Sequence, residues 1–109
     1  MVLHYERMIR FEWDPAKARA NRRKHGVSFE IAVHVFDDPD ALVEQDRIEG
    51  GERRWQTLGL VGGILLLLVA HTVRSEDGGD EIIRIISARR ADRKEKERYE
   101  KERQTRHGY

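Results

Sequence analysis

The segment from residue 82 to residue 90 constrains the fold of this chain more than any other. Isoleucine fills four of the five positions from 82 to 86, which is typical of a strand with two buried faces. Arg84 interrupts that run, and Arg89 and Arg90 follow at its end. A guanidinium stays charged, so Arg84 needs an ion-pair partner, a route to solvent or an anionic ligand. The segment therefore predicts a core strand that carries arginines to an anion-binding site.

The rest of the chain predicts an α+β domain. Alternation of apolar and polar residues predicts a strand at 9–13, and helical spacing predicts two helices at 16–25 and 28–36. Four antiparallel strands are then expected at 41–45, 53–60, 64–73 and 82–89, with a polar turn at 46–52 and a last helix at 91–107. We expect the helices to cover one face of this antiparallel meander.

Local signals place the ends of the first two helices. Asp14 and Pro15 start the first, and Gly26 ends it as a left-handed cap. Asn21 is expected to form a hydrogen bond from this helix to a loop. Ser28 caps the second helix, in which Ile31 should face the core.

The length of 109 residues predicts a single domain, 1–109. Residues 1–7 are expected to be an extension, with Met8 as an alternative natural start. Residues 101–109 should fray, because the last helix has almost no apolar stripe to hold it.

Charge is unevenly distributed along the chain. Residues 1–88 carry 12 Lys/Arg and 15 Asp/Glu, a net of −3, whereas residues 89–109 carry 9 and 5, a net of +4. A basic C-terminal end favours a polyanionic partner, although solvated helical faces show the same pattern. The absence of cysteine excludes disulfides and thiolate chemistry. The longest apolar run is too short to span a bilayer, so we expect a soluble, cytoplasmic protein.

Arginines on the predicted strands are the main candidates for a site. Arg54, Arg74, Arg84 and Arg89 occupy three neighbouring strands. Arg84 and Arg89 are five residues apart, so they should point to opposite faces unless a bulge intervenes. We therefore expect Arg89 to meet a ligand at the strand end. Arg84 either binds the same ligand or forms a buried ion pair with an acid such as Asp14 or Glu97.

Other candidates have a structural and a functional interpretation. The basic residues at the end of the first helix suit its dipole, but they could also flank a phosphate site; they are Arg22, Arg23, Lys24 and His25. His71 is most simply a core or interface histidine. No spacing of histidines or cysteines is typical of a metal site, so no metal or other cofactor is expected.

Two blocks of residues resemble the BrnT family of bacterial toxins. The first block comprises Trp13, Asp14, Lys17, Asn21, Lys24, His25, Gly26, Val27 and Phe29. The second comprises Arg54, Trp55, Gly59, Arg74, Arg84, Ile85, Ile86, Ser87, Ala88, Arg89, Ala91, Glu97, Arg98 and Tyr99. The resemblance covers about residues 8–99. One departure is His71, which stands where the family pattern leads us to expect tyrosine.

The resemblance implies a RelE-like fold and the toxin half of a type II toxin–antitoxin pair. It also implies an endoribonuclease that arrests translation. A BrnA-like antitoxin would neutralise the toxin and bind operator DNA. The implied reaction is metal-independent RNA cleavage, in which the ribose 2′-OH attacks the adjacent phosphorus. Such a reaction needs a base, cations for the phosphate and an acid for the leaving oxygen.

Carried over onto this sequence, the resemblance implies specific site residues. The expected catalytic residues are Lys24, His25, Arg54, Arg74, Arg89 and Tyr99. The expected RNA-binding residues are Arg22, Arg23, Arg84 and Arg90. The alternative is a non-catalytic module that uses the same basic face to bind nucleic acid or a protein partner.

Overall fold

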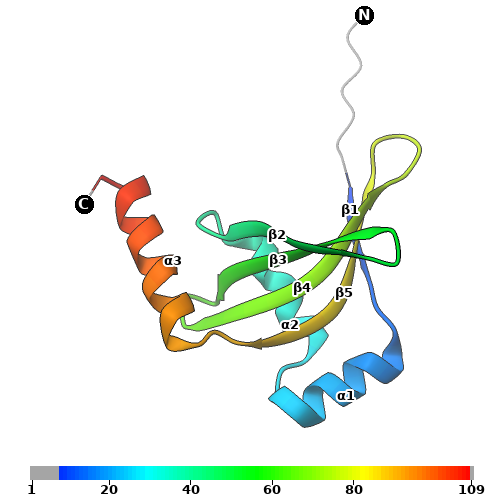
Figure 1. The fold of residues 1–109 in the computed structure, drawn as a ribbon, viewed down its shortest axis with the longest axis horizontal. Helices are drawn as coiled ribbons and strands as arrows, with labels where there is room; N and C mark the ends of the chain where they lie inside the picture. The colour runs from blue at the N-terminus through cyan, green and yellow to red at the C-terminus, as the bar shows by residue number, and fades with distance from the viewer. Residues whose placement is uncertain (1–7, 109) are drawn as a thin grey trace, which may run out of the picture.

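The computed structural model describes residues 8–108 and confirms the α+β class (Figure 1). The expected extension at 1–7 lies outside the described residues. In chain order the elements are β1 (Ile9–Glu12), α1 (Pro15–His25), α2 (Phe29–Ala32), the 3-10 helix η1 (Val33–Asp37), β2 (Leu42–Glu49), β3 (Glu52–Val61), β4 (Leu65–Ser75), β5 (Glu81–Arg90) and α3 (Arg93–Arg106).

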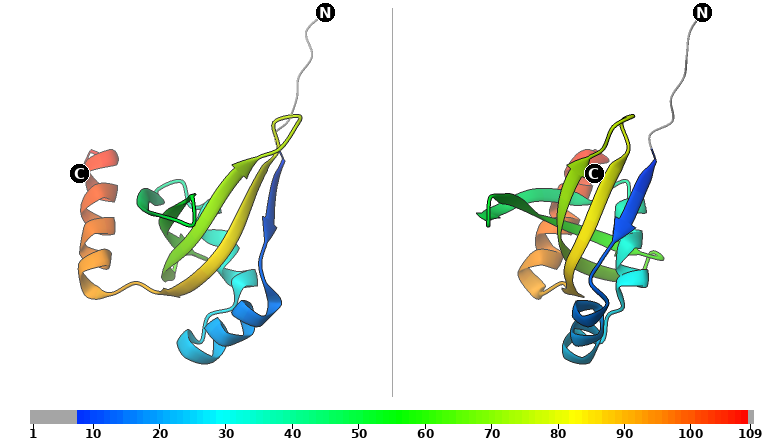
Figure 2. Two further views of the ribbon diagram at one scale, coloured as in Figure 1. Left: turned by 45° about the vertical axis from the view of Figure 1, so that its right-hand side comes forward. Right: turned by 90° about the vertical axis from the view of Figure 1, so that its right-hand side faces the viewer.

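The sheet has five strands in the order β1-β5-β4-β3-β2. The strands β2 to β5 are joined as consecutive antiparallel neighbours, and β1 adds to β5 in parallel. This order places β1 and β2 at the two edges, with β5, β4 and β3 between them. Figure 2 shows how strongly the sheet twists between its two edges.

Apolar residues lie on both faces of the sheet in two separate clusters. The larger cluster joins α1, α2 and η1 to β4 and β5, and it contains Phe29, Val35, Val69, Ile83 and Ile85. The smaller cluster lies under α3 on the other face and contains Leu58, Leu68, Ala91 and Tyr99. The helices therefore do not share one face as expected. Helix α3 covers only part of the second face, and no other helix of residues 8–108 covers the remainder (Figures 1 and 2).

The strand β2 is longer than the sequence predicted. It runs to Glu49, and only Gly50 and Gly51 form the turn to β3. Both glycines have positive φ, 59° and 81°, as a tight two-residue hairpin turn requires. Residues 46–49 were expected in a turn, but three of them, Asp46, Arg47 and Glu49, are charged and suit an edge strand that solvent reaches on both faces.

The second helix is also different from its prediction. It changes from α2 to the 3-10 helix η1 after Ala32. A 3-10 helix repeats every three residues, so Phe29, Ala32 and Val35 form the buried row. The prediction that Ile31 faces the core is wrong: its side chain is 47% exposed.

Asn21 connects α1 to the sheet. Its side-chain amide donates to the carbonyls of Val27 (3.0 Å) and Ala88 (2.9 Å), and its Oδ1 accepts from the Ala88 N–H (3.0 Å). The strand β1 pairs with β5 only as far as Arg84, so Asn21 satisfies backbone groups of β5 beyond the end of β1. The expected hydrogen bond to the loop is confirmed, and the contact with the sheet adds a second function.

Polar contacts hold α3 in place along its whole length. Asp92 and Glu95 form a capping box at its start. At its end, Arg103, Arg106 and His107 all contact Asp40, whose side chain is only 11% exposed. We expected the chain beyond residue 101 to fray, but the helix continues to Arg106 because these ion pairs replace the missing apolar stripe. Within residues 8–108, no helix is long and apolar enough to cross a membrane.

Replacing Asn21 by alanine should destabilise the fold. The change leaves the N–H and C=O of Ala88 and the C=O of Val27 without these partners inside the protein. At about 1 kcal/mol for each hydrogen bond, the free energy of unfolding should fall by roughly 3 kcal/mol. Urea unfolding measures this loss, with Arg22→Ala at the next, exposed position as the control. A loss no larger than that of the control would contradict the connecting role of Asn21.

Candidate functional site

The four strand arginines lie on the same face of the sheet, the one that α3 partly covers. Arg84 stands opposite Thr72 on β4, and Arg89 stands opposite Leu68. Arg74 is two residues beyond Thr72, and Arg54 lies on the Leu58 face of β3. We call Arg54, Arg74, Arg84 and Arg89 the arginine face.

A β-bulge in β5 brings Arg84 and Arg89 to this common face. The register pairs Ala70 with Ser87 but His71 with Ile85, so Ile86 has no partner on β4. The extra residue reverses the alternation of side chains. Ile85 and Ala88 consequently share the helix-side core although they are three residues apart. Arg84 and Arg89 were expected on opposite faces unless a bulge intervened. The bulge is present, and the two arginines share one face.

Arg84 is exposed and differs from the other three arginines in its lack of an internal partner among the described residues. It forms no hydrogen bond or salt bridge within residues 8–108. The suggested ion pair with Asp14 or Glu97 is wrong, because Asp14 caps α1 and Glu97 pairs with Arg93. Thr72, directly opposite Arg84, is only 4% exposed. A guanidinium that is free of internal partners can take a ligand phosphate without first breaking an ion pair.

Arg74 extends from β4 toward β1, where it binds Glu12. Its Nη1 lies 2.5 Å from Glu12 Oε1, and its Nη2 lies 3.2 Å from Oε2. The hydrogen bonds from Arg74, aided by the charges of Arg84 and Arg10, hold the pKa of Glu12 below its ordinary value. Glu76 contacts both Arg74 and Arg10. This end of the arginine face therefore alternates cations and carboxylates.

Arg89 is fixed to the start of α3. Its guanidinium donates to both carboxylate oxygens of Glu95, at 2.8 and 2.9 Å. These bonds hold the pKa of Glu95 below its ordinary value. Glu95 also accepts from the backbone N–H of Asp92, so the pair belongs to the helix cap. Arg89 thus forms an ion pair of the kind considered for Arg84, and Arg84 remains exposed.

Arg54 is the most buried member of the arginine face. Its side chain is 23% exposed, and its Nε lies 3.9 Å from Glu49 Oε2. That distance is too long for a hydrogen bond, and the Nε has no hydrogen-bond partner within the described residues.

The basic residues of α1 lie apart from the centre of the arginine face. Arg22, Arg23 and Lys24 are exposed, and His25 is half-buried at the end of the helix. Asn21 holds this end of α1 beside Ala88, so the cluster lies near the end of β5 that carries Arg89. No hydrogen bond or salt bridge in residues 8–108 joins the cluster to the four strand arginines.

Tyr99, an expected catalytic residue, and Arg90, an expected RNA-binding residue, both line a pocket beside α3. Tyr99 is 2% exposed, and its hydroxyl donates to Asp38 Oδ2 at 2.7 Å. Burial and the neighbouring Asp38 raise the pKa of Tyr99 far above its ordinary value. Its hydroxyl therefore holds α3 against the loop before β2. Arg90 is exposed and lines a pocket with Lys96 and Tyr99 beside α3.

His71 is a core residue, as its simplest interpretation predicted. It is 2% exposed, its Nε2 lies 2.8 Å from Thr57 Oγ1, and its ring packs edge-on against Phe36. It belongs to the helix side of β4, away from the arginine face. Burial lowers the pKa of His71 to about 4.

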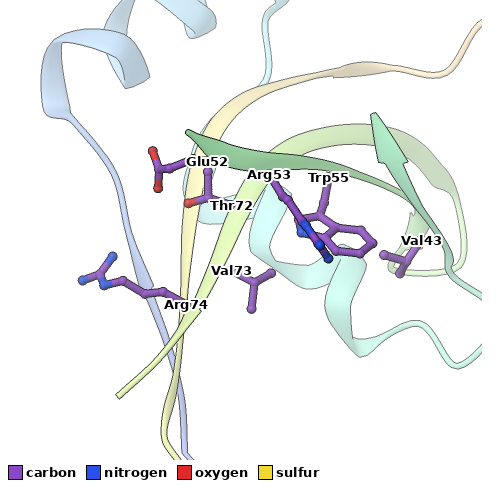
Figure 3. Close-up of a pocket in the computed structure, with 7 residues that line it drawn as sticks. All are labelled: Val43, Glu52, Arg53, Trp55, Thr72, Val73 and Arg74. Carbon is purple, nitrogen blue, oxygen red and sulfur yellow. The ribbon is translucent and has the colours of Figure 1, made fainter. Parts of the chain in front are cut away.

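An apolar pocket of about 580 Å³ lies mainly on the helix side of the sheet, across from the arginine face (Figure 3). Val43, Trp55 and Val73 line it, and all three belong to the helix side of the sheet. Arg74 also borders the pocket, but Figure 3 shows its guanidinium directed toward β1 and away from Trp55. Within residues 8–108, no group of three or more His, Asp or Glu side chains could hold a metal ion.

The carboxylates of the site were missed by the sequence interpretation. Glu12 and Glu95 are the direct partners of Arg74 and Arg89. The alternation in β1 contained a signal for Glu12, because Ile9, Phe11 and Trp13 on one face leave Glu12 on the other. Nothing local indicated that this second face would meet β5 at Arg84.

Acidification should destabilise this protein through His71. A histidine with a pKa near 6.5 when unfolded and about 4 when folded binds its proton more readily in the unfolded state. Stability is therefore complete above pH 6.5 and is lost as the pH falls toward 4, by roughly 3 kcal/mol. Denaturant unfolding between pH 7.5 and 4.5 measures this slope. His71→Gln should flatten it, whereas the exposed control His34→Gln should not. Equal slopes in wild type and His71→Gln would contradict the prediction.

Comparison with known proteins agrees with the resemblance seen in the sequence. The model of the family described as the ribonuclease toxin, BrnT, of type II toxin–antitoxin systems matches residues 13–95. The fold is similar to the crystal structure of the Brucella abortus ribonuclease toxin, BrnT, with a TM-score of 0.57 and 23% sequence identity. That match covers 79% of this chain and 99% of the other. The comparison with curated proteins finds no match. Because the family model spans most of the chain, this protein belongs to the BrnT family of ribonuclease toxins of type II toxin–antitoxin systems.

Proposed function

We propose that this toxin is an endoribonuclease that cleaves RNA without a metal ion, by attack of a ribose 2′-OH on the adjacent phosphorus. The observation that carries the proposal is the gathering of Arg54, Arg74 and Arg84 on one side of neighbouring strands, with Arg84 free of internal partners. Phosphoryl transfer builds negative charge on the phosphate oxygens, and arginine binds such oxygens in pairs.

Each arginine has a different part in this proposal. Arg84 binds the scissile phosphate, because it is exposed and unpaired. Arg74 is charged and held in place by Glu12, so it can share a second phosphate oxygen. Arg54 adds a third positive charge from β3, with a side chain that is 23% exposed. Lys24 and His25, together with Arg22 and Arg23, extend the cationic track beside the end of β5 and position the RNA strand.

The arginine face also suits the toxin–antitoxin role that the family implies. We infer that RNA cleavage arrests translation and that a BrnA-like antitoxin covers the arginine face with acidic or backbone groups. Operator DNA is then bound by the antitoxin and not by this chain. The strand order β1-β5-β4-β3-β2, with α3 following β5, supports a RelE-like layout. A translation inhibitor of this kind acts in the cytoplasm.

A cleavage assay with a metal chelator tests the proposal. The purified chain is incubated with a defined RNA and EDTA, and the products are separated. We expect fragments that end in a 2′,3′-cyclic phosphate and begin with a free 5′-OH, since the attacking oxygen comes from the RNA itself. An RNA with 2′-deoxy substitution at the cleaved nucleotide should remain intact. Folded protein that binds RNA but releases no fragments would favour the non-catalytic module instead.

Arg84→Ala should impair cleavage more than it impairs folding. The change removes a cation without leaving a buried carboxylate unpaired, so the fold should persist. We expect the cleavage rate to fall by about 100-fold or more, as for loss of one transition-state donor. The slope of log affinity against log salt concentration should decrease in magnitude by about 1, which is the contribution of one phosphate contact. Arg93→Ala on the outer face of α3 is the matched control, because it is also an exposed arginine. Equal rates for the two variants would overturn the assignment.

A further inference from the structure

The proposed reaction needs a proton acceptor, and most candidates in the chain do not suit it. Arginine side chains stay protonated at neutral pH, so they cannot accept the proton. His71 is buried on the opposite face of the sheet, and Tyr99 is buried with its hydroxyl bonded to Asp38. Lys24 and His25 lie on α1, near the far end of β5. The acceptor must therefore be sought among the carboxylates of the arginine face.

Glu12 occupies the required position. The parallel register places it directly beside Arg84, at the usual interstrand spacing of about 4.8 Å between backbones. Its side chain is 44% exposed, so a substrate can reach it. Arg74 uses one lone pair on each carboxylate oxygen, and further lone pairs remain for a hydroxyl.

The charges around Glu12 come from each neighbouring element. Arg84 on β5 stands beside it, Arg74 on β4 binds it, and Arg10 lies two residues away on β1. Glu76, at the end of β4, is held by Arg10 and Arg74. The three cations keep Glu12 ionised at neutral pH, which is the form that accepts a proton.

We propose that Glu12 is the catalytic base, which takes the proton of the 2′-OH while Arg84 holds the adjacent phosphate. This inference rests on the proposed ribonuclease activity and names the residue that starts it. Glu12 accepts the proton as the O2′–P bond forms and the P–O5′ bond breaks. The departing 5′ oxygen takes a proton from water, and Glu12 later returns its own proton to solvent. The products are a 2′,3′-cyclic phosphate and a 5′-OH, with no net change in protons.

Single-turnover cleavage by Glu12→Gln tests this role. Glutamine keeps the size of the side chain but cannot accept the proton. We expect cleavage to slow by about 100-fold or more. Affinity for the uncleavable 2′-deoxy RNA should be unchanged or higher, because a negative charge beside the phosphate has been removed. The matched control is Glu76→Gln, another carboxylate partner of Arg74 with similar exposure, 42% against 44%. Its rate should stay within about threefold of wild type.

The results separate a catalytic base from a residue that merely holds Arg74. Cleavage by Glu12→Gln at the wild-type rate overturns the proposal, and so does a loss of rate explained by an equal loss of affinity. If Glu12→Gln does not fold, the wild-type pH profile decides. The rate of folded enzyme should fall only below the ordinary pKa of a glutamate, because that of Glu12 is lowered, whereas a fall near pH 6.5 would indicate a histidine base. Wild-type protein that does not cleave RNA would overturn the ribonuclease proposal itself, whereas normal cleavage by Glu12→Gln would overturn only this inference.

Discussion

The single unpaired residue of β5 decides which side chains share a surface. Without the bulge at Ile86, a regular strand would direct Arg84 and Arg89 to opposite faces. The extra residue allows Ile83, Ile85 and Ala88 to face the helices while both arginines face the other side. The hydrogen bonds from Asn21 to Ala88 hold the backbone just beyond the bulge. The core packing and the arginine face therefore depend on the same local irregularity.

Carboxylates then distinguish arginines that look alike in the sequence. Arg89 is committed to Glu95 and the cap of α3, and Arg74 is committed to Glu12. Arg84 lacks such a pair within residues 8–108. A phosphate that approaches this face finds one free guanidinium beside a second that is already oriented. An ionised carboxylate, Glu12, is bound to the second guanidinium and stands beside Arg84 in the strand register, and this arrangement suits proton transfer next to a bound phosphate.

Local signals in the sequence were reliable where one interaction dominates. Asp14 and Gly26 cap α1 as expected, with Gly26 at φ 71°. Asn21 makes the expected contact, and the central strand is buried where isoleucines predicted it. The sequence predictions were wrong where packing against another part of the chain set the exposure of a side chain or the length of a helix. Ile31 is exposed because Phe29, Ala32 and Val35 form the row that packs on the sheet, and α3 stays helical to Arg106, where Arg103 and Arg106 contact Asp40.

The sequence by itself determined the α+β class, the strand that carries the arginines and the resemblance to a toxin family. These follow from periodicity, capping residues and motifs, which are properties of short segments. Only the tertiary structure decided that Arg84 is exposed, that Arg89 is paired, and that Tyr99 is buried against Asp38. Partners such as Glu12 and Arg74 are 62 residues apart, so no local pattern can join them. The face to which a side chain points also depends on a one-residue shift in strand register, and packing sets that shift.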